Sequence, residues 1–135
     1  SSRTNKLYQT QINNASIFES EVGANAYVRE NAIIRSNSLL LGVCNICGHA
    51  IIDHTFVGDR VEIGNYANII NTSGYLYINI ASSFSTFYKS DDKIMMQGPI
   101  CSGSLDDFIK IVIEEGNTPK YLPMINYVKS YFGEE

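Results

Sequence analysis

The chain has 135 residues, 44% of them hydrophobic, which suits one folded domain or a repeat unit with a small appendage. Its formal net charge of -4 comes from 14 acidic and 10 basic residues without a basic run, so we expect neither duplex nucleic acid nor an anionic membrane as a partner. No stretch approaches the roughly 18 apolar residues of a membrane-spanning helix, and the polar start Ser1–Lys6 does not resemble a signal peptide. We therefore expect a soluble, cytoplasmic protein.

One aliphatic position recurs about every six residues between residues 12 and 73. Its members are Ile12, Ile17, Val22, Val28, Ile34, Leu40, Ile46, Ile52, Val57, Ile63 and Ile69. Smaller residues follow most of them four positions later, at Ala26, Ala32, Ser38, Cys44, Ala50, Val61, Ala67 and Ser73. An α-helix would space its apolar residues by three and four, and an alternating strand would not keep this period for about sixty residues.

A six-residue unit makes one short strand and one corner, and three units close a triangular coil that stacks on its neighbour. Asn25, Asn31 and Asn37 recur one residue before a small position, where we expect corners with left-handed backbone angles. The sequence therefore predicts a mainly β protein. Its centre is a short left-handed parallel β-helix of about three and a half coils over residues 12–74, preceded by a lead-in over residues 1–11.

The segment Cys44-Asn-Ile-Cys47, followed by His49 and His54, has the spacing of a zinc or redox motif. In the register of the repeat, however, Cys44 takes an inward small position, whereas Cys47 follows Ile46 and points outward. The two thiols therefore diverge, and we expect neither a metal site nor a disulfide. An odd number of cysteines, three, also agrees with a reducing compartment.

The register makes two further predictions for the outside of the prism. Arg35 and Asp53 directly follow stacked aliphatic residues and are 18 positions apart, so we expect them to form a surface ion pair. Phe56 is too large for an inward small position, and we expect it to mark a bulge or an interface.

The six-residue period stops after residue 74. Three segments then have the pattern of strands: 75–80, 84–88 and 93–97. Two helices are predicted next, one between Ser104 and Gly116 and one from Thr118 to near Phe132. We expect residues 75–135 to form an α+β cap, because an uncovered terminal coil would expose a strand edge.

With this repeat, the chain resembles the hexapeptide-repeat superfamily, whose best-known members are trimeric acyltransferases. The match covers roughly half of the chain. The segment from Val57 to Thr72 is similar to the stretch that leads into a catalytic histidine in sugar and serine acetyltransferases. Here Ser73–Tyr75 stands in that place. The resemblance implies the fold and a homotrimer, but the base that acetyl transfer needs is missing.

A closer resemblance covers almost the whole chain. It is to phage, prophage and bacterial proteins that join such repeats to a small C-terminal cap. The similar pattern comprises the run Ser85 to Tyr88, a short acidic turn, a strand ending in Gly98, and the segment from Cys101 to Phe108 that opens a helix. This resemblance implies a phage-encoded protein that sequesters a small ligand or blocks a host protein inside a bacterial or infected cell.

We favour a binding protein without catalytic activity, a cofactor or a metal. Hydroxyl and aromatic side chains are concentrated just after the repeat, and arginines of a neighbouring subunit would complete a site for a small anionic or nucleotide-like ligand. The candidate ligand-binding residues are Arg29, Arg35, Arg60, Ser83, Thr86, Phe87, Tyr88 and Lys89.

Two alternatives stay open from the sequence. The first is an acyltransferase dependent on acetyl-CoA, in which one of the two histidines, His49 or His54, acts as the base at a seam between subunits. The second is a purely structural trimerisation module, since flat prism faces pack three together.

Overall fold

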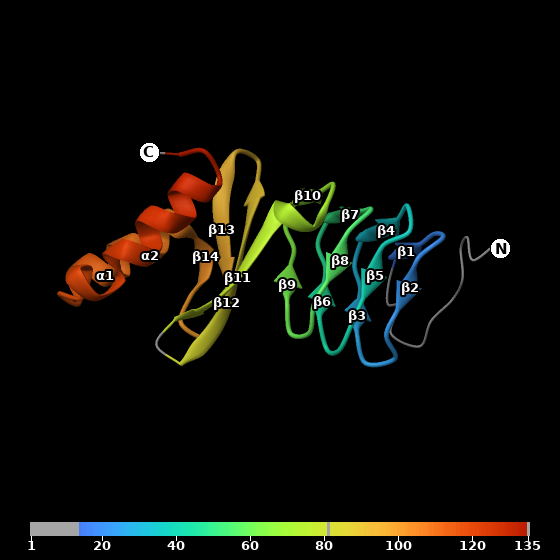
Figure 1. Cartoon of the computed structure of the whole chain (residues 1–135), viewed down its shortest axis with the longest axis horizontal. Helices are drawn as coiled ribbons and strands as arrows, with labels where there is room; N and C mark the ends of the chain where they lie inside the picture. Colours follow the sequence, from blue (N-terminus) through green and yellow to red (C-terminus); the bar gives the residue numbers. More distant parts are fainter. Residues whose placement is uncertain (1–13, 81, 135) are drawn as a thin grey trace.

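The computed structural model of the chain describes residues 14–80 and 82–134. In this part of the chain, ten short strands wind into a parallel β-solenoid of about three turns (Figure 1). An antiparallel sheet and two helices cover its C-terminal end. The predicted parallel β-helix is therefore confirmed. The predicted lead-in, residues 1–11, and the first aliphatic position, Ile12, lie outside the described residues.

The ten strands are two or three residues long and form three faces of a prism. The first face holds β1 (Ser16–Ile17), β4 (Ile33–Arg35), β7 (Ile51–Asp53) and β10 (Asn68–Ile69). The second face holds β2 (Glu21–Val22), β5 (Leu39–Leu40) and β8 (Phe56–Val57). The third face holds β3 (Tyr27–Val28), β6 (Asn45–Ile46) and β9 (Glu62–Ile63). Neighbouring strands on each face pair in parallel.

The periodic aliphatic side chains fill the prism. Nine of them are fully buried: Ile17, Val28, Ile34, Leu40, Ile46, Ile52, Val57, Ile63 and Ile69. Val22 is partly buried against them. Each burial contributes about 1.5 to 3 kcal/mol, so the stacked columns hold the coils together. The last expected small position is different, because Ser73 lies exposed in the short 3-10 helix η1 (Thr72–Gly74).

The corners correct one expectation about backbone angles. Asn37 has a positive φ of 63°, as predicted, but Asn25 and Asn31 do not have positive φ. At the corner that contains Asn31, the left-handed residue is Glu30, with a φ of 60°. The Ala32 N–H bonds the Arg29 carbonyl there, so Glu30 is the second residue of a tight turn, and this position takes the positive φ in a type II′ turn.

The cap is a sheet layer between the solenoid and a helix layer (Figure 1). The sheet has the order β11 (Tyr75–Ile80), β12 (Ser83–Ser90), β13 (Lys93–Gln97) and β14 (Ser102–Ser104), all antiparallel. The first three strands were predicted and β14 was not. The helices are α1 (Leu105–Glu114) and α2 (Thr118–Tyr131). The hydroxyl of Ser104 caps α1 by accepting the Asp107 N–H at 3.1 Å.

Side-chain hydroxyls terminate the solenoid. Within the stack, the N–H groups of one coil bond the carbonyls of the next, as from Asn45 to Val61 at 2.9 Å. Four N–H groups near the C-terminal end bond hydroxyl oxygens instead: Phe56 to Thr72, Gly58 to Tyr75, Glu62 to Thr86, and Tyr66 to Ser90. These hydroxyls take the place of a further coil, and we call this set the hydroxyl cap.

Candidate functional site

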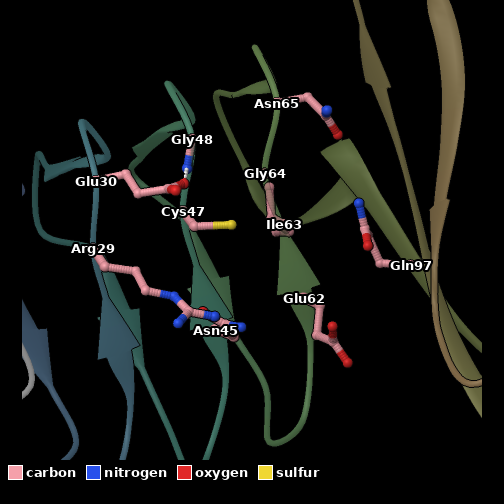
Figure 2. A pocket seen from close by; sticks show the side chains of 10 residues that line it. All are labelled: Arg29, Glu30, Asn45, Cys47, Gly48, Glu62, Ile63, Gly64, Asn65 and Gln97. Carbon is pink, nitrogen blue, oxygen red and sulfur yellow. Dashed lines mark hydrogen bonds between the residues drawn. The ribbon is translucent and has the colours of Figure 1, made fainter. Parts of the chain in front are cut away.

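A groove lies between the third face of the prism and the cap. Its volume is about 360 Å³. Figure 2 shows its lining: the solenoid contributes Arg29, Glu30, Asn45, Cys47, Gly48, Glu62, Ile63, Gly64 and Asn65, and the cap contributes Gln97. The groove therefore forms at the seam between the repeat and the appendage.

The stacked coils place the outward residues of the third face in rows. Tyr27 pairs with Asn45, and Asn45 pairs with Glu62. Two residues further along the chain at each level stand Arg29, Cys47 and Gly64, on the same side of their strands because side chains alternate. The first row, Tyr27, Asn45 and Glu62, carries hydrogen-bonding groups. The second row carries the Arg29 guanidinium, the Cys47 thiol and, at Gly64, no side chain.

Gly64 opens the hollow beside Cys47. A Cβ atom at residue 64 would lie 3.0 Å from the Cys47 Sγ and 3.7 Å from the Tyr88 hydroxyl oxygen. The first distance is tighter than ordinary van der Waals contact, so even one methyl group would crowd this part of the groove. A side chain at this position would narrow the groove beside Cys47.

Hydrogen bonds fix the polar groups around this hollow. The Tyr88 hydroxyl donates to the Asn65 Oδ1 at 2.7 Å and accepts from the Gln97 Nε2 at 3.1 Å. At the neighbouring corner, the Glu30 carboxylate accepts the Gly48 N–H at 2.6 Å. Contacts within the protein therefore hold these groups in place.

Two groups in the groove lack partners among residues 14–80 and 82–134. The Oδ1 of Asn45 is shielded from solvent and accepts no hydrogen bond there. A buried acceptor without a partner costs about 1 to 3 kcal/mol, which a donor group on a ligand would recover. The half-buried Arg29 guanidinium forms no ion pair with the described residues. The groove thus offers one acceptor and one cation to a bound molecule.

The thiols differ as the register predicted. Cys44 is fully buried, and burial raises its pKa to about 12. Cys47 is half-buried in the groove, where burial raises the pKa of its thiol and the Glu30 carboxylate raises it further. Both are free cysteines. Among the described residues, no three His, Cys, Asp or Glu side chains are placed to hold a metal ion.

The predicted ligand-binding cations do not gather at one site. Arg29 lines the groove. The other three form ion pairs elsewhere: Arg35 with Asp53 at 3.3 Å, Arg60 with Asp59 at 3.7 Å, and Lys89 with Glu134 at 3.7 Å. The predicted pair of Arg35 and Asp53 is confirmed.

The predicted hydroxyl and aromatic residues of β12 serve mainly in packing. Thr86 is buried in the hydroxyl cap, Tyr88 is buried in the solenoid core, and Phe87 is fully buried in the core beneath the helices. Ser83 is partly exposed and pairs with Ile80 at the start of the strand. Of this set, Tyr88 supports the groove through its bonds to Asn65 and Gln97, whereas Phe87 presents no ring to a ligand.

The two histidines occupy separate corners of the prism. The exposed His49 ring stacks on Tyr66, with centroids 4.8 Å apart and planes 2° from parallel. His54 has a φ of 52°, and its Nδ1 lies 3.3 Å from the Ser36 carbonyl oxygen. Neither ring lines the groove.

The sequence reading did not select most of the groove residues. Asn45, Glu62 and Gly64 share the third face with Arg29. Tyr27 and Asn45 pair at a spacing of 18 residues, whereas Asn45 and Glu62 pair at 17, because the step from Ile52 to Val57 is five residues long. The repeat indicates these positions once this short step is counted. Gln97 comes from the cap, and no repeat signal connects it to that face.

Comparison with known proteins finds no protein-family model, curated protein or solved structure that matches the chain. The resemblance to hexapeptide-repeat and phage proteins therefore stays an expectation from the sequence. No helix within the described residues is long and apolar enough to cross a membrane. The structure itself shows a parallel β-solenoid of about three turns with an α+β cap.

Proposed function

We propose that the protein is a non-catalytic binding protein whose groove takes a small anionic or nucleotide-like molecule. The observation that carries this proposal is the Asn45 Oδ1, which has no hydrogen-bond partner in the described part of the chain, in a groove that also holds Arg29, which forms no ion pair there. Buried polar groups are normally hydrogen-bonded, and those that are not call for an explanation. A ligand with a donor group and an anionic group would satisfy both residues.

The groove chemistry narrows the ligand class. A guanidinium binds carboxylates and phosphates through paired N–H groups, so Arg29 favours a ligand with one of these groups. Glu62 and Asn65 add exposed acceptors at the rim, and the negative charges of Glu30 and Glu62 mean that the ligand must also carry N–H or O–H donors on the side away from its anionic group. The volume of about 360 Å³ falls at the lower end of small-molecule sites, which favours a compact ligand. Tyr27, 49% exposed and paired with Asn45, offers a ring on which a planar group can stack.

The groove residues support binding over catalysis. A nucleophile needs a nearby base or a lowered pKa, and the Cys47 thiol has a raised pKa and no histidine beside it in the lining. Acetyl transfer from acetyl-CoA would need such a base.

We also propose that the protein forms a homotrimer through the second face of the prism. Leu39, Leu41 and Phe56 lie on this face and are 37%, 40% and 45% exposed. Exposed apolar side chains grouped on one face are typical of an interface. The six-residue period and the cap further support a relation to the hexapeptide-repeat proteins of phages and bacteria. We propose the cytoplasm as the compartment.

Isothermal titration tests the ligand proposal. The titrants are inorganic phosphate, ribonucleoside mono-, di- and triphosphates, and acetyl-CoA. We expect an anionic compound to bind, and Arg29→Gln to weaken it about tenfold or more, because a charge-assisted hydrogen bond is lost. Arg35→Gln is the matched control, since Arg35 pairs with Asp53 on another face. Equal losses in both variants would contradict the proposed site.

A further inference from the structure

The cap sheet has an open edge at β11. In the sheet order, β11 pairs with β12 on one side and with no strand on the other. The strand runs over six residues, Tyr75–Ile80, and its register with β12 is continuous, so no bulge interrupts it. The opposite edge, β14, has only three residues. The long open edge of the sheet is therefore β11.

The pairing pattern decides which backbone groups face outward. A two-residue connection joins Ile80 to Ser83, so that pair exchanges hydrogen bonds, and bonded pairs then alternate along the strands. Leu76, Ile78 and Ile80 consequently point their N–H and C=O groups toward β12. Tyr75, Tyr77 and Asn79 point theirs outward, and no backbone hydrogen bond within the described residues reaches them.

This edge lacks the usual devices that prevent pairing. Edge strands are commonly blocked by lysine, proline, a bulge or short length. The strand Tyr-Leu-Tyr-Ile-Asn-Ile carries no charge and no proline, although the chain as a whole has a net charge of -4. Two copies that approach along β11 therefore meet without placing like charges of this strand against each other.

We propose that β11 pairs with the same strand of a second copy of this chain, antiparallel and about a twofold axis at Tyr77. This register sets Tyr75 opposite the partner's Asn79 and pairs all three outward residues, for about six backbone hydrogen bonds. Other symmetric registers pair fewer of them. The two cap sheets become one continuous sheet of twice the width.

The charges near this edge have both signs. The Arg60 guanidinium and the Asp59 carboxylate form an exposed pair at 3.7 Å, and both, together with the Glu62 carboxylate, act electrostatically on the Tyr77 hydroxyl. Each copy therefore brings a cation as well as carboxylates near the contact. The contact uses β11 backbone groups, whereas the proposed trimer uses side chains of the second face.

The Asn79→Pro variant tests the pairing. Proline removes an outward N–H and places its ring on the open edge, while Leu76, Ile78 and Ile80 keep their bonds to β12. Asn79→Ala is the matched control, because it keeps the N–H. By light scattering after size-exclusion chromatography, we expect Asn79→Pro to have half the mass of the wild-type assembly and Asn79→Ala to have the wild-type mass. Circular dichroism checks that both variants fold.

Amide hydrogen exchange gives a second readout on the unmodified chain. Protection of Tyr75, Tyr77 and Asn79 is expected to rise with protein concentration, while Leu76 and Ile78 stay protected throughout. A wild-type monomer at every concentration, or an assembly whose mass Asn79→Pro leaves unchanged, would overturn the proposal. An assembly that is lost in Leu41→Lys and kept in Asn79→Pro would overturn it too, because the second face of the prism would then be the only interface. The proposal would also be overturned if the amides of Tyr75, Tyr77 and Asn79 became protected only after a different peptide had been added, because β11 would then pair with another partner.

Discussion

Residue 64 shows how one position determines the groove. Gly64 has no left-handed backbone angle that would require glycine, but a Cβ there would crowd the Cys47 sulfur at 3.0 Å. Its role is therefore to leave space. Beside it, Asn45 and Arg29 keep hydrogen-bonding capacity that the described residues do not use. These three residues of the third face carry the features on which the binding proposal rests.

The thiols provide a prediction at this scale. A maleimide reagent is expected to label Cys47 in the native protein and to leave Cys44 unlabelled until the chain unfolds. Cys44 is fully buried, and its pKa of about 12 leaves almost no thiolate at neutral pH. The pKa of Cys47 is raised too, so its labelling rate is expected to rise with pH. Peptide mapping by mass spectrometry measures both rates, and comparable native labelling of Cys44 would refute the account.

Among the elements, the strands of the prism could be predicted from the sequence, but the role of the cap residues could not. The inward aliphatic residues repeat because every short strand must bury one, so Ile17 to Ile69 followed from the pattern alone. The hydroxyl-rich run of β12 was interpreted as ligand-binding because such residues are typical of binding surfaces. In the structure, Thr86 accepts the Glu62 N–H and Tyr88 donates to the Asn65 side chain, so both hydroxyls bond the last coil. This role depends on how the sheet packs against the solenoid, which the local sequence does not encode.

Two neighbouring residues of β12 test the hydroxyl cap. Thr86→Val removes the acceptor of the Glu62 N–H, and we expect a loss of about 1 to 3 kcal/mol in the free energy of unfolding. Ser85→Ala is the matched control: the Ser85 Oγ is buried and has no hydrogen-bond partner among residues 14–80 and 82–134, so we expect no loss or a gain of about 1 kcal/mol. Urea denaturation measures both. A larger loss in Ser85→Ala than in Thr86→Val would show that the hydroxyl cap does not stabilise the fold.

In the whole molecule, the solenoid and the cap have separate cores, and β12 contributes to both. Tyr88 packs with the solenoid, while the adjacent Phe87 packs beneath the helices. The Tyr131 hydroxyl at the end of α2 also bonds the Ser73 carbonyl at the end of the repeat, at 2.6 Å. The groove lies at this junction, so it exists only when both parts are folded together. This is why the register could indicate its solenoid wall but not Gln97.

The most direct test of the binding proposal uses the whole folded chain and its Gly64→Ala variant. Each is incubated with bacterial lysate, purified again and denatured, and the released small molecules are identified by mass spectrometry. We predict that the wild type releases an anionic compound at about one per chain. Gly64→Ala, with the groove crowded but the fold intact by circular dichroism, is predicted to release at least about tenfold less. No enriched compound from the wild type, or equal amounts from both proteins, would contradict a ligand site in this groove.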